Sequence, residues 1–163
     1  MNRGVIAVLW LLLAGCDYEV PLVTTPAVAI DRAAIGLWSR TNDRGEAEQL
    51  LLLPLGEREY LASFPAGRGN ALFARATLWR DAAMTLVQVD WIGTARGTLP
   101  DDQRTFQYAA YAIAGDTLTL RLVNPEVVPG TLASADALAR TLREQRDHPA
   151  LYRPALVFHR VGN

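Results

Sequence analysis

The residue types that carry catalytic or metal chemistry are scarce in this chain. Its candidates are one cysteine, Cys16, two histidines, His148 and His159, and three serines. A catalytic nucleophile needs a base within reach, and a metal site needs ligands at characteristic spacings. Neither histidine has a ligand-spaced partner, and no serine lies in a Gly-x-Ser-x-Gly motif. We therefore expect a protein that is not an enzyme and that uses no metal and no cofactor.

Composition narrows the class of protein. The chain has 163 residues, of which 50% are hydrophobic, and its net charge is −1. This size and apolar content fit one domain with its own core. All 16 cations are arginines and they are scattered along the chain, whereas nucleic-acid binding needs a clustered excess of cations. We expect no nucleic-acid partner, and one cysteine allows no disulfide within the chain.

Cys16 stands at the end of an apolar N-terminus. Arg3 is followed by an almost unbroken apolar run over residues 5–14, and small residues precede the cysteine. This order is typical of a secretory signal peptide. The run is shorter than the roughly 20 residues that a helix needs to cross a bilayer. Residues 1–15 are therefore predicted to be a signal peptide.

The four residues Leu13-Ala14-Gly15-Cys16 resemble the lipobox of bacterial lipoproteins. The resemblance implies cleavage before Cys16 and attachment of lipid, such as palmitate, to that residue. Each buried CH₂ of an acyl chain contributes about 0.8 kcal/mol, so several chains hold a soluble domain on a membrane. The implied location is periplasmic, and Asp17 resembles an inner-membrane retention signal, which favours the inner over the outer membrane. An ordinary signal peptide with an incidental cysteine is the alternative.

Residues 16–29 are predicted to form an extended tether. This stretch contains Pro21 and Pro26 and has no amphipathic periodicity. Proline lacks an amide donor and favours extended backbone. An edge strand that pairs through Val20, Leu22 and Val23 is the alternative. The folded domain is expected to span residues 30–163.

Beyond the tether, short apolar runs alternate with turn signals, which is typical of an all-β domain. The consecutive leucines at 50–53 indicate a strand buried on both faces. Ser134 is a helix N-cap, and His148-Pro149 would end that helix. Eight strands are predicted at 35–40, 48–55, 59–64, 72–80, 84–92, 106–114, 117–123 and 155–161, with one helix before the last.

Eight sequential antiparallel strands can remove their exposed edges by closing into a barrel. Gly36-Leu37-Trp38, at the head of the first strand, resembles the Gly-x-Trp motif of lipocalins. The resemblance implies that Trp38 closes the base of a barrel and that Arg160 packs over it. The predicted fold is a mainly β, antiparallel, eight-stranded lipocalin-like barrel or strongly curved sheet. A sandwich in which Trp38 is an ordinary core aromatic is the alternative.

Two charged residues lie inside predicted strands, Asp90 and Arg75. If either pointed into a barrel, it could bind a polar group of a ligand. The alternation of Val87, Val89 and Trp91 places Asp90 on the other face, so solvent exposure is favoured. Aromatic residues that could line a pocket or fill the core cluster in the same region: Phe73, Trp79, Trp91, Phe106, Tyr108 and Tyr111.

Together these patterns predict a membrane-anchored periplasmic lipoprotein that acts as a non-enzymatic binding or interaction module of the cell envelope. The alternative is a lipocalin-like carrier or sensor of a small hydrophobic ligand. The implied partners are the membrane, through lipid on Cys16, and either an envelope protein or such a ligand.

Overall fold

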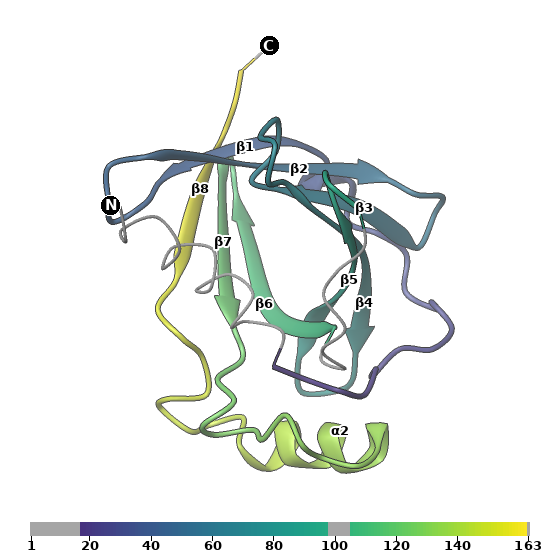
Figure 1. The fold of residues 1–163 in the computed structure, drawn as a ribbon. Helices are drawn as coiled ribbons and strands as arrows, with labels where there is room; N and C mark the ends of the chain where they lie inside the picture. The colour runs from purple at the N-terminus through teal and green to yellow at the C-terminus, as the bar shows by residue number, and fades with distance from the viewer. Residues whose placement is uncertain (1–16, 98–104, 163) are drawn as a thin grey trace, which may run out of the picture.

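The computed structural model describes residues 17–97 and 105–162. Their strands form a closed antiparallel barrel in chain order, β1 to β8, which confirms the predicted fold (Figure 1). A single helix, α2 (Ala135–Glu144), precedes the last strand. The strands are β1 (Gly36–Thr41), β2 (Ala47–Pro54), β3 (Glu59–Phe64), β4 (Leu72–Arg80), β5 (Thr85–Thr94), β6 (Phe106–Ala114), β7 (Thr117–Leu122) and β8 (Leu156–Arg160).

Alternation along the strands divides the barrel into an inner and an outer wall. Val87, Val89 and Trp91 of β5 line the interior, as the sequence predicted. The leucines at 118, 120 and 122 of β7 do the same. Closure pairs β1 with β8 through Trp38 and Arg160, so the described barrel strands leave no free edge.

The leucines of β2 are not buried on both faces, and that prediction was wrong. Leu50 and Leu52 line the interior, whereas Leu53 is 41% exposed. The other two leucines of β2, Leu51 and Leu53, point outward. They pair on the outer wall with Leu37 and Leu61, respectively. Among the described elements none covers Leu53, whereas Leu37, Leu51 and Leu61 of the same outer row are half-buried.

The chain that enters β1 closes one end of the barrel, which we call the base. The base contains Ile30, Ala34, Trp38 and Tyr60. A 3-10 helix, η1 (Arg32–Ala34), is capped by Asp31, whose side chain accepts a hydrogen bond from the amide of Ala33. The Tyr60 hydroxyl accepts from the amide of Asp31 and donates to its carbonyl oxygen, at 2.6 and 2.9 Å. These bonds hold η1 across the end of the barrel.

Trp38 and Arg160 form the contact that the lipocalin resemblance implies. Trp38 is fully buried, and the Arg160 guanidinium lies 4.1 Å from the centre of its ring. The same guanidinium donates to the carbonyl oxygens of Ile35 and Ala33, at 2.9 and 2.7 Å. Gly36 has a φ of +135°, and a Cβ there would lie 2.9 Å from Arg160 Nη1. The backbone conformation therefore favours glycine, and any larger residue would also displace the Arg160 guanidinium.

The segment 17–29 is extended, but it is not a loose tether. Tyr18 is 1% exposed, and it pairs with Phe106 at the start of β6. The Tyr108 hydroxyl donates to the carbonyl oxygen of Val20 and accepts from the amide of Leu22. The packed domain therefore includes the described residues before Ile30, from Asp17 onward.

Side chains take the place of a neighbouring strand for this segment. Gln88 accepts from the amide of Val23 and donates to its carbonyl oxygen, both at 2.9 Å. Gln88 and Tyr108 project from the outer wall of β5 and β6, so they satisfy the backbone without a regular ladder. The edge-strand alternative named the right backbone groups but not their partners.

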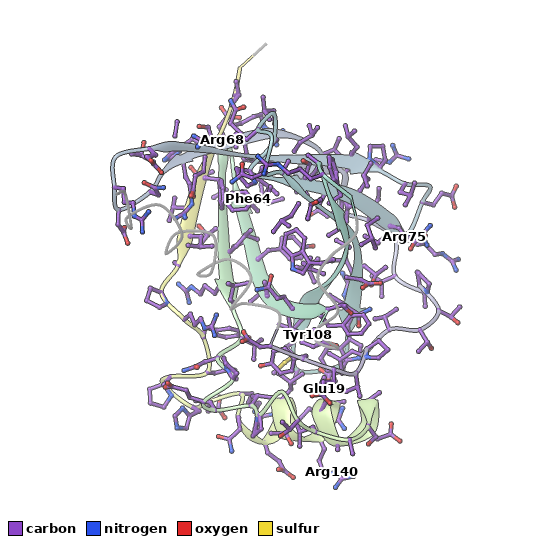
Figure 2. The ribbon with its side chains drawn as sticks, in the orientation of Figure 1. Glu19, Phe64, Arg68, Arg75, Tyr108 and Arg140 are labelled. Atoms are coloured by element: carbon purple, nitrogen blue, oxygen red, sulfur yellow. The ribbon has the colours of Figure 1, made fainter. Side chains whose placement is uncertain are left out.

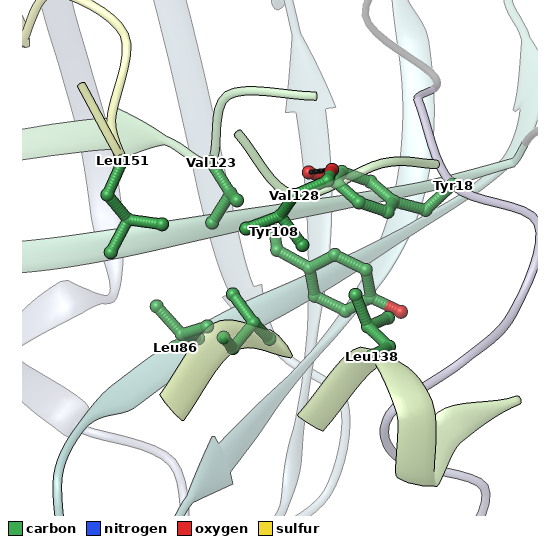
Figure 3. Packing of buried hydrophobic residues seen from close by; sticks show 8 residues of the cluster. Tyr18, Leu86, Tyr108, Val123, Val128, Leu138 and Leu151 are labelled. Carbon is green, nitrogen blue, oxygen red and sulfur yellow. Dashed lines mark hydrogen bonds between the residues drawn. The ribbon is translucent and has the colours of Figure 1, made fainter. Parts of the chain in front are cut away.

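Helix α2 packs its apolar face against the outer wall (Figure 3). Ser134 caps it by accepting from the amide of Ala137, and Leu138 and Leu142 are fully buried. They meet Leu86 and Tyr108 in one core cluster. The helix ends at Glu144, earlier than predicted, because the next positions on its buried face are polar and leave nothing to bury.

Candidate functional site: the barrel cavity

The interior of the barrel contains a cavity of about 170 Å³. Its walls are almost entirely apolar, and every strand except β1 contributes to them. An engineered apolar cavity of ~150 Å³ stays dry and takes up benzene, so this space suits a compact apolar molecule. The lining comprises Ala34, Leu50, Leu52, Tyr60, Ala62, Phe64, Leu72, Ala76, Leu78, Val87, Val89, Trp91, Gln107, Ala109, Tyr111, Leu118, Leu120, Leu122, Arg153, Leu156 and Phe158.

The lining extends from one end of the barrel to the other. Tyr60, Leu78 and Leu118 lie toward the base and are at most 3% exposed. Trp91, Leu122, Arg153 and Leu156 lie toward the opposite end and are all half-buried. We call these four residues the mouth, because they lie at the end of the barrel opposite η1.

Polar groups inside the cavity are few and mostly satisfied. Trp91 donates from Nε1 to Oε1 of Gln107 at 2.9 Å, which pairs the indole with the buried amide. Burial raises the pKa of Tyr60 to about 12, although its hydrogen bond with the backbone of Asp31 acts in the opposite direction. Burial also raises the pKa of Tyr111. Both phenols are therefore neutral at physiological pH, as an apolar site requires.

Arg153 is the one charged side chain in the lining. Its Nη2 lies 3.0 Å from Oδ2 of Asp17, and the Arg153 side chain is 34% exposed. The backbone amide of Arg153 is held by the carbonyl oxygen of Leu122, the last residue of β7. The mouth therefore carries an ion pair that joins the first described residue of the chain to the connection between α2 and β8.

A second ion pair lies beside the cavity. Arg40 Nη2 and Glu48 Oε2 are 2.6 Å apart, and both side chains are less than 20% exposed. The Arg40 guanidinium lies 5.6 Å from the ring centre of Phe158, which lines the cavity. By alternation with Trp38 and Leu50, both charged side chains belong to the inner wall. The pair lies inside the barrel beside the cavity, and neither Arg40 nor Glu48 belongs to the cavity lining.

The two charged strand residues singled out in the sequence lie outside the cavity. Arg75 is exposed on the outer surface of β4, 4.0 Å from Glu59 (Figure 2). Asp90 is opposite Arg75 in the β4–β5 pair. Partial burial raises the pKa of Asp90, against the opposing effects of a Thr105 hydrogen bond and of Arg75. The prediction that both residues face outward is confirmed.

The aromatic cluster serves two different places. Trp91 and Tyr111 line the cavity. Tyr108, Phe106 and Trp79 belong instead to the core cluster between the outer wall, the N-terminal segment and α2. Phe64 and Phe158, on β3 and β8, complete the lining with rings 6.1 Å apart at 80°.

Other sequence candidates do not gather at this site. His148 and His159 are exposed, and no cluster of potential metal ligands occurs among residues 17–97 and 105–162. Cys16, the signal peptide over 1–15 and the lipobox lie outside the described residues.

Sequence reasoning missed Arg153, Arg40 and Glu48. Arg153 stands between Tyr152 and Pro154, outside any periodic run, so nothing local indicates that it reaches a cavity. Arg40 and Glu48 did carry a signal, because each stands in alternation with inward residues of its strand.

The chain matches no known protein-family model, no curated protein and no solved structure. Within the part of the chain that the structure describes, no helix has both the length and the apolar character to cross a membrane.

Proposed function

We propose that this protein is a lipid-anchored, non-enzymatic binding protein of the bacterial cell envelope, and that its barrel takes up a small apolar molecule. The observation that carries the ligand class is the apolar cavity of about 170 Å³ inside a closed barrel. Its size favours one or two fused rings or a short acyl chain over a long fatty acid. Lipidation at Cys16, with a periplasmic location, rests on the lipobox sequence.

The cavity is tested by filling it. Ala109 lines the interior of β6, and Ala112 is exposed on the outer wall of the same strand. Titration of the protein with 1-aminonaphthalene is expected to give saturable fluorescence enhancement. Ala109→Leu should weaken this binding at least about tenfold, because its added methyl groups occupy the ligand's space, whereas Ala112→Leu should bind like the wild type.

Burial of the probe in an apolar site also predicts a negative heat-capacity change of binding by calorimetry. A wild-type protein that binds neither this amine nor benzene would refute the proposed ligand class. Equal weakening by both leucine variants would mean that the probe does not sit in the cavity.

The anchor is tested separately. Metabolic labelling with palmitate in a bacterial host is expected to mark the wild-type protein and not Cys16→Ser. Equal labelling of the two would refute lipidation at this residue and leave the ligand proposal standing.

A second candidate function, binding of an envelope protein, is favoured by the outer leucine row. This row consists of Leu37, Leu51, Leu53 and Leu61, which pair across β1, β2 and β3 on the solvent side. Leu53 is exposed and the other three are half-buried, and apolar side chains that meet on a solvent-facing wall are typical of interaction surfaces. A photo-crosslinking residue at position 53 is expected to form an adduct in membranes. The control position, 75, is exposed on the same wall and should form none.

A further inference from the structure

The N-terminal segment joins the predicted lipid to the mouth of the cavity. Asp17 follows Cys16 directly and forms its ion pair with Arg153 at the mouth. From there the chain runs along the outer wall past Tyr108 and Gln88, and it reaches the base at Ile30. The anchor site and the mouth are therefore at the same end of the barrel, opposite η1.

The chain is fixed from its first described residue. A Cβ at Gly130 would lie 1.5 Å from the carbonyl oxygen of Asp17, so the two backbones are in direct contact. The Tyr18 hydroxyl donates to the carbonyl oxygen of Val128 at 3.0 Å, and Tyr18 is almost fully buried (Figure 3). Residues 17 and 18 are thus held by the loop between β7 and α2 and cannot act as a spacer.

The length of chain between lipid and domain follows from covalent geometry. Neighbouring Cα atoms are about 3.8 Å apart, so one peptide unit separates the lipid-bearing residue from the ion pair at the mouth. A flexible tether of fourteen residues would have allowed the barrel to turn freely (the predicted 16–29 segment), but this segment is packed onto the domain.

We infer that the lipid on Cys16 holds the barrel directly against the bilayer, with the mouth of the cavity facing the lipid surface. This inference rests on the lipid anchor of the proposed function. It assigns the partner of the mouth as a lipid bilayer, and it gives an apolar ligand a short route between the membrane and the cavity.

The orientation can be measured with single introduced cysteines. The thiol of the one native cysteine carries the lipid and therefore does not react with the label. Ala95, after β5, and Ala155, before β8, are exposed at the end of the barrel that carries the mouth. Ala114 is exposed beside the β6–β7 turn, whose Asp116 contacts Arg160 at the base. Each alanine is replaced singly by cysteine in the full-length, processed lipoprotein and is labelled with a nitroxide.

The labelled proteins are reconstituted on vesicles of phosphatidylethanolamine and phosphatidylglycerol. Accessibility to a water-soluble nickel complex is compared with accessibility in detergent-free solution for the unlipidated Cys16→Ser forms. Labels at Ala95→Cys and Ala155→Cys are expected to lose accessibility severalfold on vesicles, whereas Ala114→Cys should not change. Equal protection of all three labels, or greater protection at position 114, would overturn the inference.

A spacer variant separates this inference from the anchor itself. A Gly/Ser insert of about ten residues between Cys16 and Asp17 adds roughly 17 Å of mean reach. It should still float with vesicles but lose the protection at positions 95 and 155. Protection that persists despite the spacer would overturn the role of the short connection. Failure of the wild type to incorporate palmitate and to float would instead refute the anchor, and the inference with it.

Discussion

At the scale of single residues, Arg160 is the side chain on which the closed end of the barrel depends most. It covers the ring of Trp38, donates to two backbone carbonyl oxygens of the chain that enters β1, and lies 3.5 Å from Asp116. Hydrogen bonds to charged groups contribute about 1.5–3 kcal/mol each, and a partly desolvated cation over an indole about 0.5–2 kcal/mol. One side chain thus joins β8 to the base.

Arg160→Met is therefore expected to lower the free energy of unfolding by about 2–4 kcal/mol, because both carbonyl oxygens lose their donor while the apolar contact with Trp38 is kept. Urea unfolding followed by tryptophan fluorescence measures the change. Arg121→Met, on the exposed outer wall of β7, is the control and should stay near the wild-type value. A loss at Arg160 no larger than at Arg121 would contradict this role.

At the scale of elements, the N-terminal segment is packed onto the outer wall of the barrel. Gly130 is expected to be essential for the position of the N-terminal segment, because any side chain at this residue would collide with the Asp17 carbonyl. Gly130→Ala should displace residues 17 and 18 and cost about 1–3 kcal/mol, the usual range for overpacking. Limited proteolysis should then cut the segment faster than in the wild type. Gly69→Ala, which meets nothing within 4 Å, is the control and should leave both measurements unchanged.

The strands themselves could be predicted from sequence because each follows its own alternation. The predicted ranges 59–64, 72–80 and 106–114 coincide with β3, β4 and β6. The end of β5 could not be predicted, because a register shift between Phe73 and Ala74 lengthens its pairing with β4. Such a shift depends on hydrogen bonds between strands and leaves no periodic signal.

The N-terminal segment and the mouth could not be predicted for a related reason. A proline-containing segment is predicted to be a tether when its own sequence shows no hydrogen-bond partners for its backbone. Here the partners are the side chains of Gln88 and Tyr108, which are some 65 to 88 residues away. The Asp17–Arg153 pair likewise joins opposite ends of the chain. The contact at the base could be predicted, since Gly36, Trp38 and Arg160 of the first and last strands match the lipocalin arrangement.

At the scale of the whole molecule, packing shields the phenol groups of all the tyrosines from water. Burial raises the pKa of all five tyrosines, which lie in the base, in the cavity wall, in the outer core cluster and beside the mouth. A tyrosine in an unfolded chain ionises near pH 10. Since each folded-state pKa is higher, the folded protein binds more protons than the unfolded chain at alkaline pH. The linked stability is complete below about pH 10 and is lost as the pH rises toward the folded-state values.

This linkage predicts a cooperative alkaline unfolding in which tyrosinate appears together with loss of the barrel. Ultraviolet absorbance of tyrosinate and far-ultraviolet circular dichroism, recorded against pH on the same sample, should change in one transition above about pH 10. In strong denaturant the tyrosinate titration should move down to the ordinary value for a free phenol. Tyr60, whose pKa is raised to about 12, ties this transition to the base, because ionisation there removes the donor to Asp31 and releases η1. A tyrosine that titrates reversibly near pH 10 while the dichroism stays native would contradict this prediction. It would show that the region around that tyrosine is open to water and that the barrel is not closed and packed as a single unit.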